Sequence, residues 1–203
     1  MLGSHDSFTY LKATSKLVET FSMFWRCQDK TIKEQYDDGV RCFDVRVAAD
    51  TFNGKNVWTT AHGLAEFNQT FVSLTSIMSF FKKQYPGSVL RIVLECDCDN
   101  EEIVERFKKQ CTTIQKSYKA QIWQLVIKKP WTILYNNDNL SVNDCACHLF
   151  GWDMERSVWE NITHFDFSSM SIKSYAKKHN PQMTQEMKDD PNIVYFMDYA
   201  GTY

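Results

Sequence analysis

Short apolar runs and amphipathic stretches alternate along this chain of 203 residues, and the alternation limits the folds that it can adopt. The clearest apolar run is Ser88 to Glu95, where valine, leucine and isoleucine are nearly continuous, as in a strand buried within a parallel sheet. Residues 74–85 before it and 101–118 after it have the pattern of amphipathic helices. Helix, strand and helix in this order predict an α/β protein with parallel strands.

Further elements are expected on both sides of this unit. The predicted strands are residues 40–47, 55–61, 131–135 and 193–197, and the predicted helices are residues 29–38 and 172–179. Residues 136–166 are rich in asparagine, aspartate and tryptophan and have no pattern that assigns them to an element. Polar side chains follow nearly every predicted strand at its C-terminal end, which is where a (β/α) barrel has its active site.

The expected fold is therefore α/β, a small and distorted (β/α)8-type TIM barrel. A doubly wound sheet would also alternate strands and helices, but the glycine-rich phosphate-binding loop that often marks that fold is missing. No repeat or low-complexity linker divides the chain, so we expect one domain over residues 1–203.

Composition and charge exclude some classes of function. Hydrophobic residues make up 43% of the chain, charged residues 24%, and the net charge is −2, as in ordinary globular proteins. Nucleic acid is not expected as a partner, because the basic runs are no longer than Lys-Lys pairs. No apolar window approaches the ~20 residues of a spanning helix. No export segment is visible either, and both a secreted and a cytoplasmic location stay open.

The seven cysteines are an odd number, so at least one stays outside any intramolecular disulfide. Cys96-x-Cys98 and Cys145-x-Cys147-His148 have one-residue gaps, whereas zinc knuckles use two-residue gaps. Residues i and i+2 share one face of a strand, so Cys96 and Cys98 are interpreted as small core residues. We expect reduced thiols and no structural metal.

Chemically active side chains gather in three short motifs near the start of the chain. They are Gly3-Ser4-His5-Asp6-Ser7, Phe43-Asp44-Val45-Arg46 and Ala61-His62-Gly63. Together they provide two imidazoles, a guanidinium and two carboxylates at the polar ends of apolar runs. One imidazole can take a proton, the second can give one, and the guanidinium can hold the charge that builds up on phosphorus. This set predicts metal-free attack on a phosphodiester.

The three motifs and their neighbours resemble the X-domain of phosphatidylinositol-specific phospholipase C. The neighbouring residues that take part in the resemblance are Gly39 to Arg46, His62-Gly63-Leu64, and Pro86-Gly87-Ser88 leading into Ile92 to Glu95. The resemblance is strongest to the bacterial, metal-independent branch, and it covers roughly the first half of the chain and the last ten residues. It implies a distorted barrel that cleaves phosphatidylinositol at a membrane surface. The products would be diacylglycerol and inositol 1,2-cyclic phosphate. Because only Met1 and Leu2 precede the first motif, where a strand would normally stand, we expect the chain to be truncated at its N-terminus.

The resemblance gives the motif residues their roles. His5 would be the general base that removes the proton of the inositol 2-hydroxyl, and His62 the general acid that protonates the departing diacylglycerol oxygen. Arg46 would stabilise the phosphate charge with a planar donor fork that lysine cannot reproduce. Asp6 would pair with Arg46 and aim it, and Asp44, on the same strand face as Arg46, would help to fix it.

A further carboxylate is needed on the second ring nitrogen of His5 to fix its tautomer. In the family it comes from a late strand, and Asp198 is assigned this part because it directly ends the apolar run 193–197. Asp166 is the alternative. The remaining histidines are expected to have structural roles only: His148, His164 and His179.

Glu95 departs from the bacterial pattern. At this point the metal-independent enzymes are expected to carry a lysine, whereas the calcium-dependent eukaryotic enzymes carry a glutamate as a metal ligand. Those enzymes also have a carboxylate where Arg46 stands and an asparagine where Asp6 stands. The positive charge of Arg46 can replace that of the calcium ion. We therefore expect Glu95 to pair with Arg46 or a neighbouring group. No metal or other cofactor is expected, with calcium as the alternative that a chelator would test.

Two other functions remain open from the sequence. One is a related barrel phosphodiesterase acting on another phospholipid or a glycerophosphodiester, and the other is a catalytically silent domain that binds inositol phosphates. Arg46 argues against the usual metal cluster of the first, and the intact His5 and His62 argue against the second. The substrate is expected at a membrane surface, and candidate contacts are three tryptophans: Trp123, Trp152 and Trp159. The head group and the oligomeric state stay open.

Overall fold

The computed structural model describes residues 1–144, 171–189 and 193–201. Its strands are β1 (Leu2–Ser4), β2 (Cys42–Phe52), β3 (Lys55–His62), β4 (Ala65–Phe71), β5 (Val89–Leu94), β6 (Ile122–Ile127), β7 (Thr132–Asn136), β8 (Ser141–Asp144) and β9 (Ile193–Met197). Its helices are α1 (Lys16–Thr20), α2 (Ile32–Asp37), α3 (Leu74–Gln84), α4 (Glu101–Tyr118) and α6 (Ile172–Asp189), with 3-10 turns η1 (Ser22–Phe24) and η2 (Lys119–Gln121).

The described strands form one mixed sheet in the order β7-β6-β5-β2-β1-β9-β8, with β3 beside β2 and β4 beside β3. The strands from β6 to β8 along this path are parallel, and β7, β3 and β4 pair antiparallel with their neighbours. Because β9 pairs with β1, the order resembles that of a barrel. The α/β class is therefore confirmed.

Within the described residues the sheet is open, whereas a barrel had been expected. β6 is followed by β7, which returns antiparallel along it after a short turn. A parallel strand would require a longer crossover connection, so β7 occupies the side of β6 where the next barrel strand would pair. The open side lies between β7 and β8.

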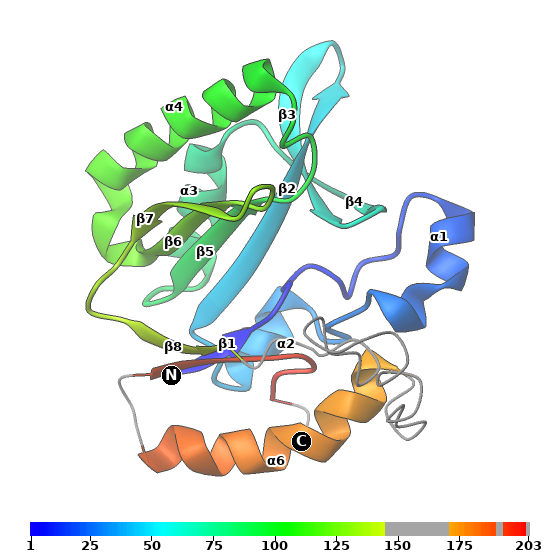
Figure 1. Ribbon diagram of the computed structural model, residues 1–203, viewed down its shortest axis with the longest axis vertical. Coiled ribbons are helices and arrows are strands. Elements are labelled where there is room, and N and C mark those ends of the chain that lie inside the picture. Colours follow the sequence, from blue (N-terminus) through cyan, green and yellow to red (C-terminus); the bar gives the residue numbers. More distant parts are fainter. Residues whose placement is uncertain (145–170, 190–192, 202–203) are drawn as a thin grey trace.

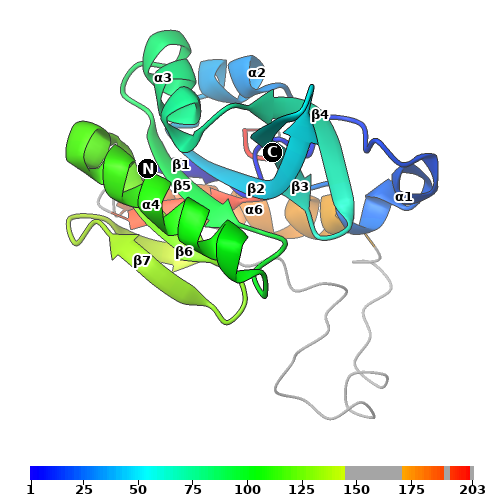
Figure 2. The same cartoon turned by 90° about the horizontal axis from the view of Figure 1, so that it is seen from above.

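The main core lies between the sheet and the helices on its outer face. Figures 1 and 2 show α3 and α4 beside each other over β5 and β6, and α6 along β9. Phe43 and Val45 of β2 belong to the same buried cluster as Phe81 of α3 and Phe107 of α4. The rings of Phe43 and Phe81 have centroids 5.1 Å apart. Burial of these side chains stabilises each helix against the sheet.

The opposite face of β2 is the one that carries chemistry. Cys42, Asp44 and Arg46 point away from the main core, because alternate residues of a strand face opposite sides. All three are buried. Below them Trp123 of β6 stacks on Phe196 of β9, with ring centroids 4.7 Å apart. This inner face therefore has an apolar floor and a charged upper part.

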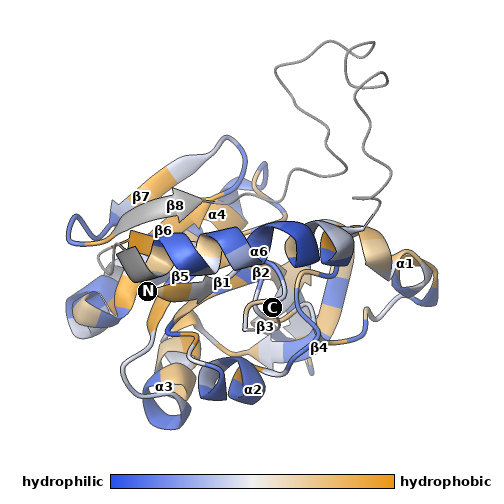
Figure 3. Ribbon diagram, turned by 90° about the horizontal axis from the view of Figure 1, so that it is seen from below, coloured by the Kyte–Doolittle hydropathy of each residue, from blue (hydrophilic) through white to orange (hydrophobic). Residues whose placement is uncertain are grey.

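Trp123 is consequently not a membrane contact, contrary to the expectation. Only 1% of its surface is exposed, because it lies in a strand and packs on Phe196. Trp152 and Trp159 lie outside the described residues. None of the described helices is long and apolar enough to span a bilayer. Figure 3, coloured by residue hydropathy, shows α6 as mostly hydrophilic with a few apolar residues between, as expected of a helix that packs on one side only.

Candidate active site

The candidate active site lies at the C-terminal edge of the parallel strands, because consecutive parallel strands end at the same edge of the sheet. His5 follows β1, Glu95 follows β5 and Asp198 follows β9. Asp44 and Arg46 lie within β2, beside the end of β1. The sequence motifs thus meet in space, although they are far apart in the chain.

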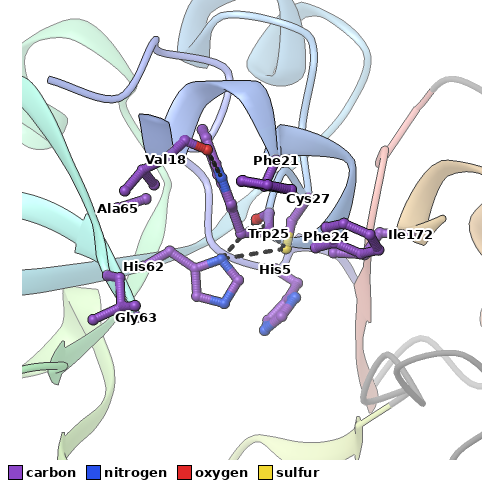
Figure 4. A pocket seen from close by; sticks show the side chains of 11 residues that line it. His5, Val18, Phe21, Phe24, Trp25, Cys27, His62, Gly63, Ala65 and Ile172 are labelled. Atoms are coloured by element: carbon purple, nitrogen blue, oxygen red, sulfur yellow. Dashed lines mark hydrogen bonds between the residues drawn. The ribbon is translucent and has the colours of Figure 1, made fainter. Parts of the chain in front are cut away.

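His62 reaches this edge by a different route. β2 continues past the edge, and β3 returns antiparallel beside it, with Thr60 opposite Val47. His62 ends β3, and Gly63 begins the turn to β4 with a φ of 58°, a conformation that glycine adopts easily. The hairpin places the His62 and His5 rings with centroids 6.2 Å apart and planes at 80° (Figure 4).

The hydrogen bonds of His5 define its tautomer. Nη2 of Arg46 lies 2.6 Å from Nε2 of His5, and Oδ1 of Asp198 lies 2.7 Å from Nδ1. A guanidinium can only donate and a carboxylate can only accept. Nδ1 therefore carries the proton that is donated to Asp198, and Nε2 carries the lone pair. The structure places Asp198 beside this ring, where Nε2 can serve as a base.

Arg46 is held by buried carboxylates on several sides. Its Nε donates to Oδ2 of Asp44 at 2.9 Å, and its Nη1 donates to Oε2 of Glu95 at 3.3 Å. Burial alone would lower the pKa of Arg46, but Asp44, Asp6 and Glu95 raise it well above its usual range. Burial would likewise raise the pKa of Asp44, yet Arg46 and Arg91 keep it below its usual range. Arg46 therefore keeps its positive charge.

Glu95 joins three parts of the site. Besides Arg46, it accepts a hydrogen bond from the backbone of Gly63 at 2.8 Å, and it forms an ion pair with Lys128. Although burial would raise its pKa, Arg46 and Lys128 lower it, so Glu95 is anionic. The expected pairing of Glu95 with Arg46 is present. Lys128, directly after β6, was not anticipated from the sequence.

The hydrogen bonds of His62 also define its tautomer. Nδ1 lies 2.7 Å from the carbonyl oxygen of Trp25. Because a carbonyl can only accept, Nδ1 carries the proton and Nε2 is the nitrogen available to a substrate. Burial, with Arg46 and His5 nearby, lowers the pKa of His62 from 6.5 to about 4. The ring is therefore neutral near pH 7 before substrate binds.

Asp6 forms the expected ion pair with Arg46 and lies slightly closer to His62, a contact that the sequence did not indicate. Its Oδ2 is 3.2 Å from Nδ1 of His62 and 3.6 Å from Nε of Arg46. The backbone of Asp6 is left-handed, with a φ of 45°, and its amide donates to Asp44 at 3.2 Å. Burial raises the pKa of Asp6 well above its usual range. Asp44, not Asp6, makes the close contact with Arg46.

Two amide side chains, which the sequence did not single out, hold the strand ends together. Nε2 of Gln28 donates to the carbonyl oxygens of His5 and Met197, each at 2.9 Å. Asn180 of α6 donates to the carbonyl oxygen of Asp198 at 2.8 Å. These bonds satisfy buried carbonyls and fix the backbones that carry His5 and Asp198.

A cavity of about 360 Å³ opens beside the two histidines (Figure 4). Apart from His5, His62 and Cys27, its lining is mostly apolar and comes from α1, η1, the turn after β3 and the start of α6. We call the exposed apolar side chains that line this opening the apolar rim: Phe21, Phe24 and Leu64. Leu64 is 91% exposed and Phe21 is 51% exposed. The site therefore combines a charged end with an apolar end.

The oxygens that a calcium ion would need are engaged by side-chain cations. Oδ2 of Asp44 and Oε2 of Glu95 accept from Arg46, and Oε1 of Glu95 contacts Lys128. A calcium ion requires six to eight oxygen ligands, and Arg46 holds the centre of this set of oxygens. The donor set therefore does not fit calcium while Arg46 is in place.

The remaining sequence motifs lie elsewhere. Cys96 and Cys98 follow β5 in a turn and are therefore not in a strand as expected. Sγ of Cys96 donates to the Gly63 carbonyl at 3.2 Å, whereas Cys98 is partly buried and packs against the main core, in line with the core interpretation. His179 stacks on Tyr175 within α6, with centroids 4.1 Å apart, in line with a structural role. The other residues considered lie outside the described part of the chain: Cys145, Cys147, His148, His164 and Asp166.

Fold and site together define an α/β protein with an open, barrel-like sheet and a paired-histidine site at its strand ends. Solved structures with this fold include the phosphatidylinositol-specific phospholipase C of Listeria monocytogenes, which is 14% identical, with a TM-score of 0.58 over 98% of this chain and 87% of that chain. The enzyme of the same name from Staphylococcus aureus is 19% identical, with a TM-score of 0.57 over 99% and 86%. No protein-family model and no curated protein sequence matches the chain. The likeness shows a shared fold.

Proposed function

We propose that this chain is a phosphodiesterase of the lyase type that cleaves phosphatidylinositol into diacylglycerol and inositol 1,2-cyclic phosphate. The observation that carries the proposal is the placement of Arg46 against Nε2 of His5, with the His62 ring 6.2 Å from the His5 ring. A base, an acid and a cation thereby surround a space suited to a phosphodiester. The proposal takes residues 1–203 as one catalytic unit with the strand order of a distorted barrel.

In the first half of the reaction, His5 acts as the general base. Its Nε2 takes the proton of the inositol 2-hydroxyl, and that oxygen attacks phosphorus from within the same molecule. An intramolecular nucleophile has a high effective concentration, so the protein needs mainly to orient it. Asp198, 2.7 Å from Nδ1, stabilises the imidazolium that forms. Arg46 must turn from Nε2 toward the phosphate oxygens when substrate binds.

In the second half of the reaction, His62 acts as the general acid. The bond from phosphorus to the diacylglycerol oxygen breaks, and Nε2 of His62 gives that oxygen a proton. Because Nδ1 already carries one proton, His62 must hold a second one to act as an acid. Its pKa of about 4 in the free protein is too low for this near pH 7. A bound phosphate anion would raise it, so the substrate itself helps to charge the acid.

Arg46 completes the proposed chemistry. Its guanidinium stabilises charge on the non-bridging phosphate oxygens, which is the work that a metal ion does in other phosphodiesterases. Asp44 and Glu95 keep it oriented through 2.9 Å and 3.3 Å contacts. We therefore propose a reaction that needs no metal and proceeds at full rate in the presence of a chelator.

The apolar end of the site supports a lipid substrate. A diacylglycerol leaving group needs apolar surroundings next to His62, and the cavity and the apolar rim lie there. Exposed phenylalanine and leucine side chains around a site opening are typical of proteins that contact membranes or other apolar surfaces. We propose that the substrate is taken from a membrane surface at this rim.

Incubation with phosphatidylinositol vesicles in EDTA, followed by phosphorus NMR, tests the proposal. The expected product is inositol 1,2-cyclic phosphate, formed by the wild type and by His179→Ala, which changes a histidine outside the site. His5→Ala should form none above background. A wild type without turnover, or a His5→Ala variant with unchanged turnover, would overturn the proposal.

A further inference from the structure

Cys27 lies on the floor of the site, and the proposed reaction does not use it. Its side chain is fully buried, and its Sγ is 4.0 Å from Nδ1 of His62 (Figure 4). Sγ, Nδ1 of His62 and a carboxylate oxygen of Asp6 all lie within 4.8 Å of one another. A thiol, an imidazole and a carboxylate are the three ligand types that zinc uses in proteins.

A backbone oxygen adds a further donor to this cluster. The carbonyl oxygen of Trp25 is 2.7 Å from Nδ1 of His62 and 3.5 Å from Sγ of Cys27. Nδ1 is also 3.2 Å from Oδ2 of Asp6. Ligand atoms bound to one zinc ion at about 2.0–2.3 Å in a tetrahedral arrangement lie between about 3 and 4 Å from one another. The cluster is therefore nearly of the right size for zinc.

Asp6 supplies an independent sign of a missing partner. Its Oδ2 is buried and accepts no hydrogen bond, although buried polar atoms are normally satisfied. A second possible cluster consists of Cys27, His5 and Asp198. In that cluster, however, His5 and Asp198 already form a hydrogen bond of 2.7 Å with each other. The orphan oxygen therefore favours the cluster with Asp6 over the cluster with Asp198.

We propose that Asp6, Cys27 and His62 form an inhibitory site for a zinc ion. The Cys27 thiolate and the Asp6 carboxylate would balance the two positive charges of the ion, so that it can lie near Arg46. Binding releases the thiol proton of Cys27, and any proton on the Asp6 carboxyl, to solvent, whereas the His62 proton moves from Nδ1 to Nε2. The cavity beside the histidines is lined by Cys27 and His62 and gives the ion a route from solvent.

A zinc ion at Nδ1 would stop the proposed reaction at His62. With Nδ1 bound to the metal, the ring can carry a proton only on Nε2 and cannot become an imidazolium. A neutral imidazole is a far weaker acid than an imidazolium, so the leaving oxygen would not be protonated. This inhibition rests on the proposed function, whereas binding of the ion does not.

Direct binding is the first test, because it does not depend on activity. Zinc is titrated into a Cys145→Ser/Cys147→Ser background, which removes the other Cys and His motif of the sequence from the measurement. We expect one site in this background. Cys27→Ser should weaken zinc binding by roughly 100-fold or more, because it removes the soft ligand. Cys98→Ser is the matched control and should bind as before.

Cobalt(II) binding to the protein with Cys27 intact provides a second test, which does not depend on whether a Cys27 variant folds. Cobalt bound in the proposed site should show the thiolate-to-cobalt charge-transfer absorption of a sulfur ligand, and zinc should displace it. Calcium should neither bind nor displace cobalt, because it prefers oxygen ligands. Absence of the thiolate band, or zinc binding that Cys27→Ser leaves unchanged, would overturn the proposal.

Activity then distinguishes the inhibition from the binding. If the proposed lyase reaction occurs, zinc should suppress it in the wild type, EDTA should restore it, and Cys27→Ser should stay active in zinc. Suppression of Cys27→Ser at the same zinc concentration would contradict the inhibitory role. If no lyase activity exists, the binding measurements still decide whether the zinc site is real.

Discussion

Nη2 of Arg46 lies 2.6 Å from Nε2 of His5, and Nδ1 of the same ring lies 2.7 Å from Asp198. The arginine therefore covers the basic nitrogen before substrate arrives, and the aspartate holds the opposite side of the ring. A phosphate that draws the guanidinium away would expose Nε2 at the moment when a base is needed. In the proposed reaction, this relationship would couple phosphate binding to base activation.

Asp198→Asn should lower kcat by roughly 10²–10⁴-fold, the range expected when a histidine loses the carboxylate that sets its tautomer. KM should change little, because Asp198 contacts His5 and not the proposed substrate position. Steady-state kinetics on phosphatidylinositol vesicles measures both constants. A loss confined to KM would mean that Asp198 binds substrate.

Arg46→Lys should lower kcat/KM by roughly 10²–10³-fold, as removal of a single donor to a developing charge does in other enzymes. Lysine keeps the charge but cannot contact Asp44, Glu95 and a phosphate at once. Thermal unfolding of the same variant is the control, since a retained melting transition shows that the loss is chemical. Near wild-type activity would show that only the positive charge matters.

Asp6→Asn should increase the free energy of unfolding near pH 7, because the native protein bears the cost of a buried Asp6 whose unfolded form is ionised. The folded pKa of Asp6 is raised above its unfolded value, so the stability that its proton provides is lost as the pH rises through the folded pKa. Asparagine avoids that loss and also tolerates the left-handed backbone. Denaturant unfolding at several pH values should show the gain shrinking as the pH falls. A large destabilisation at pH 7 would contradict this account.

His62 should titrate in the free protein with a pKa of about 4, well below 6.5. Because the folded pKa is the lower one, the neutral ring contributes stability that is present above about pH 6.5 and is lost as the pH falls toward 4. NMR of the ring, assigned with His62→Gln, measures the pKa. Addition of an inositol phosphate should raise it, and an unchanged value would argue against an anion site beside this ring.

Strong local patterns made much of the fold predictable. Val89 to Leu94 is an almost unbroken apolar run, and residues 101–118 form a helix that begins at the capping residue Asn100. Both elements were expected at nearly their observed bounds. The position of Asp198 beside His5 could be expected because Asp198 directly follows an apolar strand, and parallel strands end at the same edge of the sheet.

Tertiary contacts explain what the sequence did not reveal. β6 follows α4 through η2 with no glycine or proline between them, so Ile122–Ile127 was missed and Lys128 with it. Cys27 and Trp25 lie in a stretch without periodicity, and only the return of β3 brings His62 beside them. Closure of the barrel was expected from strand and helix alternation, but an antiparallel return such as β7 breaks that pattern.

The most direct test of the division of labour between the two histidines compares two leaving groups. A substrate with a nitrophenyl leaving group needs no general acid, because that oxygen departs as a stable anion. We predict that His62→Ala loses most activity on phosphatidylinositol but recovers toward the wild-type rate on inositol nitrophenyl phosphate, whereas His5→Ala is inactive on both. Equal losses of His62→Ala on the two substrates would contradict the account.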